Sequence, residues 1–111
     1  ATRPLRATGQ PYRGINVLLL WIEAQASGFI SPSWMTYRQA QALGAQVRKG
    51  ERGATIVYYG DSNKTVRDEV SGEDSEHRFR FLKSYTVFNV AQIDGLPERF
   101  HYIPEPAPEV Q

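Results

Sequence analysis

The stretch at 34–60, "WMTYRQAQALGAQVRKGERGATIVYYG", decides the fold because helical and strand signals follow one another within it. Thr36 and Gln39, three residues apart, form a capping box, in which the hydroxyl and the amide satisfy each other's free backbone N–H groups. Gly44, directly after Leu43, is typical of a helix end. We therefore predict a short helix that begins after Thr36 and ends at Gly44.

Strand signals follow this helix. The run from Thr55 to Tyr59 is β-branched and aromatic and predicts a strand, and Val47 starts or flanks another. Between them, "RKGERG" at 48–53 is typical of a turn. The run "FRFLKSYTVFNV" at 79–90 alternates well enough to predict one long strand. The intervening residues 60–78 are polar and acidic and predict a long loop.

The residues before this stretch predict a further helix. The segment "PYRGINVLLLW" at 11–21 opens a run, 15–26, without Gly or Pro, and Gly28 is a plausible stop. Gly14 and Asn16 are interpreted as structural, with Asn16 as a possible helix cap. Four apolar residues recur at helical spacing and predict the buried stripe of this helix: Ile15, Leu18, Leu19 and Ile22.

The order of elements predicts the fold class. Helices first and strands afterwards favour an α+β fold, with two N-terminal helices packed on one face of a small antiparallel sheet. A chain of 111 residues suffices for one domain, which we place at 1–103. Residues 1–13 carry Pro4, Gly9 and Pro11 and predict an extended arm. The proline-rich residues 104–111 are typical of the start of a linker.

The composition favours a soluble binding domain. No apolar run approaches the ~20 residues of a membrane span. The absence of cysteine excludes disulfides and thiolate metal sites and fits a reducing cytoplasm. The net charge of +1 hides an asymmetry, because residues 1–53 balance at +5 and residues 54–111 at −4. Such a split suggests one positive face, although charge runs are usually plain solvated surface.

No catalytic constellation is visible. His77 and His101 lie in unrelated contexts, and neither belongs to an HExxH motif or another metal-ligand spacing. There is no GxSxG motif, no cysteine and no phosphate-binding loop ending in GKS or GKT. We therefore expect no enzyme activity, no metal and no cofactor in this domain.

Aromatic and basic residues interleave along the chain, as single-stranded nucleic acid binders require, because bases stack on rings while cations follow the phosphates. Arg13 precedes a helix, where a cation is unfavourable for the helix itself, so its position favours a role in binding. We interpret Trp21, Phe79, Phe81 and Phe88 as core residues. The candidate binding residues are Tyr12, Arg13, Trp34, Tyr37, Arg38, Arg48, Lys49, Arg52, Tyr59 and Tyr85.

Three blocks carry a family resemblance: "PYRGINVLLL", "WMTYRQAQALGAQVRKGERGATIVYY" and "FLKSYTVFNVAQIDGLP". In order and spacing, over 11–97, they resemble the N-terminal domain of ArdC-like antirestriction proteins, which is shared with TraC-type plasmid primases. The resemblance implies a single-stranded DNA-binding module of a conjugative plasmid or other mobile element. It also implies a following metallopeptidase-like domain, whose HExxH motif does not occur here. In this light, the glycines of "VRKGERG" would let the backbone approach a phosphate.

Two other hypotheses stay open. The domain would act as a protein-interaction adaptor if its aromatic surface docked a restriction or replication protein, and Trp34 would then matter more than the 48–52 cations. Alternatively, the acidic loop at 61–76 would occupy the basic groove as a phosphate mimic, so that its deletion would raise the affinity for DNA.

Overall fold

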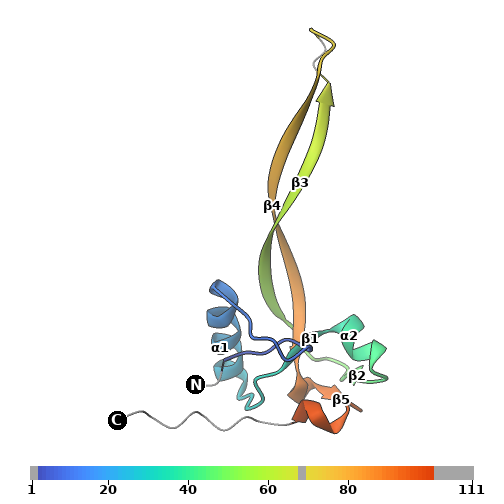
Figure 1. Ribbon diagram of the computed structural model, residues 1–111. Coiled ribbons are helices and arrows are strands. Elements are labelled where there is room, and N and C mark those ends of the chain that lie inside the picture. The colour runs from blue at the N-terminus through green and yellow to red at the C-terminus, as the bar shows by residue number, and fades with distance from the viewer. Residues whose placement is uncertain (1–2, 68–69, 102–111) are drawn as a thin grey trace.

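A long antiparallel hairpin rises from a small base of helices and short strands (Figure 1). The computed structural model describes residues 3–67 and 70–101. Strand β3 (Ala54–Arg67) pairs with β4 (Asp74–Asn89) along its whole length, from Ala54 opposite Val87 to Arg67 opposite Asp74. The predicted strands at 55–59 and 79–90 are confirmed as parts of this hairpin.

The prediction of a long loop at 60–78 is wrong, because β3 continues to Arg67 and β4 begins at Asp74. The loop was inferred from the polar and acidic composition of these residues. In the structure this part of the hairpin projects beyond the helices (Figure 1). A ribbon that carries no helix needs no apolar face, so its sequence lacks the alternation of a half-buried strand.

Short strands complete two antiparallel sheets. β1 (Trp34–Thr36) pairs with the end of β4, which gives a three-stranded sheet in the order β1-β4-β3. β2 (Gln46–Val47) pairs with β5 (Ile93–Asp94), which confirms the strand predicted at Val47. Two 3₁₀ turns, η1 (Val90–Gln92) and η2 (Glu98–His101), flank β5. The mixture of helices and antiparallel strands agrees with the predicted α+β class.

Both predicted helices are confirmed. α1 (Ile15–Ser27) ends at Gly28, whose φ of 75° is left-handed. α2 (Tyr37–Ala42) begins with the predicted capping box: the Thr36 N–H donates to Gln39 Oε1 over 2.8 Å, and the Gln39 N–H donates to Thr36 Oγ1 over 3.1 Å. Within the described ranges, neither helix is long and apolar enough to cross a membrane.

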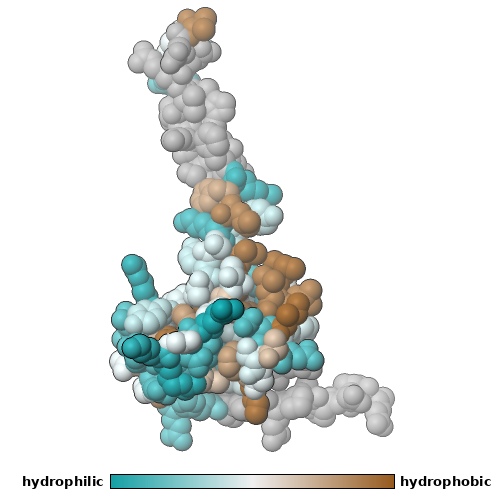
Figure 2. Space-filling view, turned by 180° about the vertical axis from the view of Figure 1, so that it is seen from behind, coloured by the Kyte–Doolittle hydropathy of each residue, from teal (hydrophilic) through white to brown (hydrophobic). Residues whose placement is uncertain are grey.

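The predicted buried stripe of α1 faces solvent. Ile15, Leu18 and Ile22 are 55%, 50% and 61% exposed and Leu19 is half-buried, whereas Leu20, outside the predicted stripe, is fully buried. Apolar residues accordingly gather on the surface of the molecule seen from behind (Figure 2). The helical spacing was read correctly, but the stripe that it marks is the outer one.

Asn16 explains this orientation of α1. Its Nδ2 donates to the Val57 carbonyl oxygen and its Oδ1 accepts from the Val57 N–H, each over 2.8 Å. Because β3 is an edge strand, the Asn16 amide replaces a missing strand partner there. The residue is 3% exposed and makes no capping bond, so the prediction of a helix cap is wrong.

The interior consists of two hydrophobic clusters, and each helix contributes to a different one. Leu20 of α1 packs with Trp34, Ile56 and Val87. Ala40 of α2 belongs to the other cluster, which is formed by residues of β1, β2, β5, η1, η2 and the segments between them: Met35, Ala45, Val47, Val90, Ile93, Leu96 and Phe100. This arrangement differs from the predicted packing of both helices on one face of a single sheet.

The N-terminal segment is folded back rather than extended. Leu5 bridges to Pro11, the Arg6 N–H donates to the Gln10 carbonyl oxygen over 2.7 Å, and the Tyr12 N–H donates to Pro4 over 2.9 Å. Gly9, with a φ of 87°, supplies the left-handed turn that this reversal requires. The prediction of an extended arm is therefore wrong. The predicted linker at 104–111 lies outside the described residues.

Candidate nucleic-acid interface

Arg6 lies at the root of the hairpin, between two aromatic rings. Its Cζ is 5.5 Å from the ring centroid of Tyr12 and 5.5 Å from that of Tyr58. The Arg6 Nε is buried and has no hydrogen-bond partner among the described residues. Such an unsatisfied buried donor is costly, and this one marks a place where an acceptor is missing.

Two hollows adjoin Arg6 and Tyr58, which line both of them. The first, of about 280 Å³, is completed by Tyr12, Thr36, Gln39, Ile56, Tyr85 and Val87. The second, of about 350 Å³, is completed by Arg13, Gly14, Ile15, Asn16, Val57 and Tyr59. We call the six basic and aromatic residues of these two hollows the hairpin-root surface: Arg6, Tyr12, Arg13, Tyr58, Tyr59 and Tyr85.

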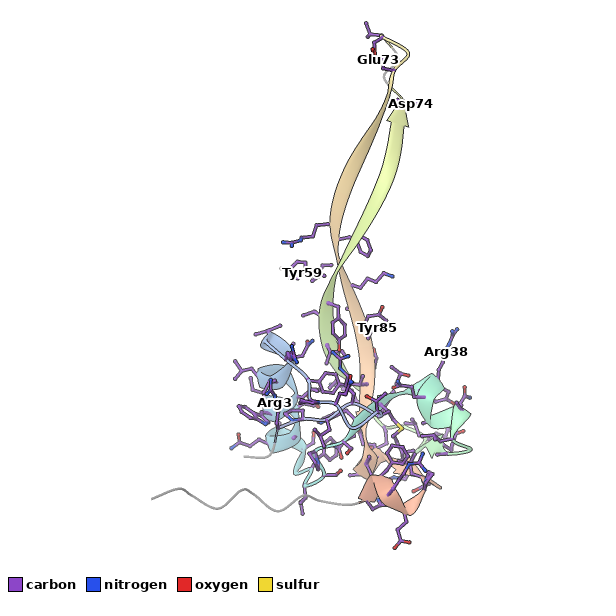
Figure 3. The ribbon with its side chains drawn as sticks, in the orientation of Figure 1. Arg3, Arg38, Tyr59, Glu73, Asp74 and Tyr85 are labelled. Carbon is purple, nitrogen blue, oxygen red and sulfur yellow. The ribbon has the colours of Figure 1, made fainter. Side chains whose placement is uncertain are left out.

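Two predicted aromatic residues on this surface are exposed. Tyr59 is 74% exposed, with the Arg80 Cζ 5.6 Å from its ring centroid. Tyr85 is 43% exposed and packs edge-on against Tyr58, with ring centroids 5.8 Å apart. Figure 3 shows Tyr59 and Tyr85 on the hairpin just above the helices. Both rings therefore offer a surface on which a base can stack.

Tyr12 and Trp34 are buried, in contrast to the expectation of accessible rings. Tyr12 is 3% exposed. Burial, with a smaller contribution from Tyr58, raises the pKa of Tyr12 to about 12, although the positive charge of Arg6 acts to lower it. Trp34 is 1% exposed and packs edge-on against Phe29. Trp21, expected in the core, is 38% exposed. The Trp34 ring therefore serves the core, and Tyr12 contributes only as part of the wall beside Arg6.

Arg13 and Arg38 are exposed cations at the starts of the two helices. Among the residues that the structure describes, neither has a hydrogen bond or an ion pair. Arg38 rises from α2 on one side of the hairpin, whereas Tyr59 lies further along the hairpin itself (Figure 3). Both guanidinium groups are therefore available to a phosphate.

The turn at 48–53 contains one cation that is ion-paired within the domain and two that are exposed. Arg48 binds Asp94 over 3.2 Å and Glu51 over 3.4 Å and also donates to the Ala91 carbonyl oxygen. Lys49 and Arg52 are exposed, and within 3–67 and 70–101 their side chains have no ion-pair partner. The charge of Arg48 is therefore compensated internally, which argues against a phosphate contact.

A separate groove of about 860 Å³ adjoins this turn. Lys49 and Tyr37 line it, and the Tyr37 hydroxyl accepts from Gln46 Nε2 over 3.0 Å. Glu51 and Asp94 line the same groove. Because its lining includes carboxylates, this groove is less suited to a polyanion than the two hollows at the root of the hairpin, neither of which is lined by a carboxylate.

Sequence reasoning missed Arg6, Tyr58 and Asn16 as parts of the site. Arg6 counted only toward the basic half, since its two ring partners are six and 52 residues away in the chain. The described residues contain no group of three or more His, Cys, Asp or Glu side chains that could hold a metal ion.

A family model for the N-terminal domain of anti-restriction factor ArdC matches residues 1–88, and the chain belongs to this family. Two crystal structures of the antirestriction ArdC protein from the R388 plasmid are similar. The metal-free structure has a TM-score of 0.78 and 53% identity over 90% of this chain and 35% of that one. The Mn(II)-bound structure has a TM-score of 0.71 and 47% identity over 97% of this chain and 37% of that one.

Curated relatives agree. The protein y4eC of Sinorhizobium fredii, which has no described function, is 45% identical over 89% of this chain and 34% of its own length. The DNA primase TraC of Escherichia coli is 43% identical over 81% of this chain and 9% of its own length. The chain thus spans about a third or less of these longer proteins.

Proposed function

We propose that this domain binds single-stranded DNA, with little sequence preference, through the hairpin-root surface and Arg38. The observation that carries the proposal is the Arg6 guanidinium, which lies beside two rings and lines two hollows that contain no carboxylate. A polyanion with stacked bases supplies both the acceptors and the flat partners that this surface lacks.

Cations and rings line the same hollows at the root of the hairpin. Arg13 shares its hollow with Tyr59, and Arg6 shares both hollows with Tyr58. Guanidinium groups follow the phosphates, while Tyr59 and Tyr85 each stack a base, a contact of ~1–3 kcal/mol that any base can make. The role is non-catalytic, and it would serve an antirestriction protein of a plasmid by holding the transferred strand in the cytoplasm.

Fluorescence anisotropy of a labelled single-stranded oligonucleotide tests this proposal, with duplex of the same sequence as competitor. We expect saturable binding that weakens steeply with salt and prefers the single strand. Arg13→Ala and Tyr59→Ala should each weaken binding, whereas the exposed Gln25→Ala on the far end of α1 should not. Failure to bind at low salt would overturn the proposal.

The apolar outer face of α1 favours the second candidate, a protein-docking adaptor. Ile15, Leu18 and Ile22 are each at least half exposed on adjacent turns, and such clusters often mark protein contacts. The partner would be the metallopeptidase-like domain that the family resemblance implies, or a restriction or replication protein. In that case Leu18→Ser would weaken the protein contact and leave the affinity for DNA unchanged.

A further inference from the structure

The smaller hollow beside Arg6 offers side-chain hydrogen-bond donors whose neighbouring acceptor oxygens are already occupied. Gln39 Oε1 already accepts from the Thr36 N–H, so its Nε2 remains as a donor. Thr36 Oγ1 already accepts from the Gln39 N–H, so its hydroxyl proton remains to be donated. Arg6 also lines the hollow, and its guanidinium group carries only donors. No carboxylate lines the hollow, so a ligand there must supply acceptors.

The walls of the same hollow are flat and apolar. Tyr12, Tyr58 and Tyr85 contribute rings, while Ile56 and Val87 contribute aliphatic surface. Burial raises the pKa of Tyr12 to about 12, so its hydroxyl keeps its proton at neutral pH. A hydrated phosphate gains nothing from contact with apolar walls, whereas a planar ring with carbonyl groups packs against the walls and accepts from the donors.

We propose that this hollow takes one nucleobase of the bound single strand and that it favours a base rich in carbonyl acceptors, thymine above adenine. The inference rests on the proposed single-stranded DNA binding. Thymine presents two carbonyl oxygens to the donors of Arg6, Thr36 and Gln39. Adenine presents only one ring-nitrogen acceptor beside its exocyclic amine on either edge, and the amine would face donors. At about 280 Å³, the hollow is smaller than the ~300–1000 Å³ of typical ligand pockets, so it suits a single ring.

Equilibrium anisotropy with three single strands of equal length tests this inference: oligothymidylate, oligoadenylate and a strand of abasic sites. We expect the wild-type protein to prefer oligothymidylate over oligoadenylate by about fivefold, the effect of one hydrogen bond of ~1 kcal/mol. The abasic strand should bind more weakly than either. Arg6→Met and Tyr85→Leu should bring the preference for thymine close to one.

Tyr59→Leu is the matched control, because Tyr59 is an exposed ring outside this hollow. It should weaken both base-containing strands alike and leave the preference unchanged. Since adenine strands stack on themselves in every measurement, the comparison of ratios between variants cancels that effect. Tyr85 is 43% exposed, so Tyr85→Leu keeps the test valid if Arg6→Met fails to fold.

The outcomes separate the two proposals. If the wild-type protein binds none of the strands, single-stranded DNA binding itself is wrong. If it binds thymine and adenine strands equally, or if Tyr85→Leu leaves the preference intact, DNA binding stands and the base pocket is wrong. An abasic strand that binds as tightly as oligothymidylate would show that the hollow holds a phosphate instead.

Discussion

At the scale of single residues, Asn16 fixes the position of α1 on the hairpin. Its side chain satisfies both main-chain groups of Val57 on the open edge of β3. Leu20 is thereby turned into the cluster around Trp34, while Ile22 is left in solvent. The amide thus decides which of two apolar stripes is buried, although it contributes no apolar surface itself.

Asn16→Ala should therefore destabilise the domain by about 2 kcal/mol, because a buried group left without its partner costs ~1–3 kcal/mol. Urea unfolding followed by circular dichroism measures this loss. Gln25→Ala, an exposed change in the same helix, should alter the free energy of unfolding by less than ~0.5 kcal/mol. Equal losses in the two variants would show that Asn16 does not anchor α1.

Tyr12 should make stability depend on pH in the alkaline range. Its pKa is about 12 in the folded domain and near its ordinary value of 10.0 in the unfolded chain. The folded state therefore keeps the phenol proton longer, and its contribution is fully present below pH 10. It is lost as the pH rises from 10 to 12, by as much as ~3 kcal/mol.

Tyr12→Phe removes this titrating group and keeps the ring. The free energy of unfolding, measured in urea at several pH values, should fall less steeply between pH 10 and 12 in the variant than in the wild-type domain. The other tyrosines are common to both proteins and cancel in the difference. Parallel curves for the two proteins would mean that Tyr12 titrates in the folded domain as it does in the unfolded chain.

The exposure of these side chains could not be predicted from sequence. Tyr12 and Trp34 stand beside loops and helix starts, which suggested accessible rings, but both are buried by partners distant in the chain, such as Tyr58 and Val87. The four-residue stripe on α1 was visible because its period is local. Which stripe faces inward depends on Asn16 and Val57, which are 41 residues apart.

At the scale of elements, locally encoded features were predictable. The capping box of Thr36 and Gln39 involves residues three apart and was confirmed, as was the end of α1 at Gly28. The upper hairpin was not predicted, because it consists largely of backbone pairs between polar residues, such as Thr65 with Glu76. A polar composition does not distinguish such paired strands from a loop. The exposed tyrosines at 59 and 85 were identified, whereas their grouping around Arg6 depends on the folded N-terminal segment.

A shortened hairpin tests whether binding needs only the root of the hairpin or also its upper part. The main-chain N–H and carbonyl groups of Val57 point away from β4, because Asn16 binds both of them, so Val57–Ser84 is a non-hydrogen-bonded pair of the ladder. Hydrogen-bonded and non-hydrogen-bonded pairs alternate along an antiparallel ladder, so Gly60–Phe81, three pairs further on, is a hydrogen-bonded pair. A hydrogen-bonded pair is a suitable base for a two-residue Asn-Gly turn in place of 61–80. This variant keeps Tyr58, Tyr59 and Tyr85.

We expect the shortened protein to fold and to bind single-stranded DNA with an affinity changed by less than about fivefold, since exposed charges contribute ~1 kcal/mol or less. Anisotropy against the wild-type protein measures this ratio. A much larger gain in affinity would support the hypothesis that the acidic segment at 61–76 competes with phosphates. Loss of binding would place the interface on the upper hairpin instead.

At the scale of the whole molecule, the basic half of the sequence is not uniformly available. The balance of +5 over residues 1–53 includes Arg48, whose charge is compensated by Asp94 and Glu51. Arg13 and Arg38 remain exposed at the two helix starts. The charge count predicted a positive face, but contacts across the chain decide which cations can meet a phosphate.

The salt dependence of binding should therefore distinguish Arg13 from Arg48. Each phosphate that the protein neutralises on a single strand contributes ~0.7 to the steepness of log K against log salt, because its condensed counterions are released into solution. Arg13→Ala should make the slope shallower by about 0.7 and leave the stability nearly unchanged. Arg48→Ala should leave the slope unchanged but lower the stability, because Asp94 and the Ala91 carbonyl oxygen lose a partner. Anisotropy titrations at four salt concentrations, with urea unfolding of the same preparations, measure both quantities. If Arg48→Ala changed the slope as much as Arg13→Ala, the turn at 48–53 would be a phosphate site and the interface would extend to the groove beside Tyr37.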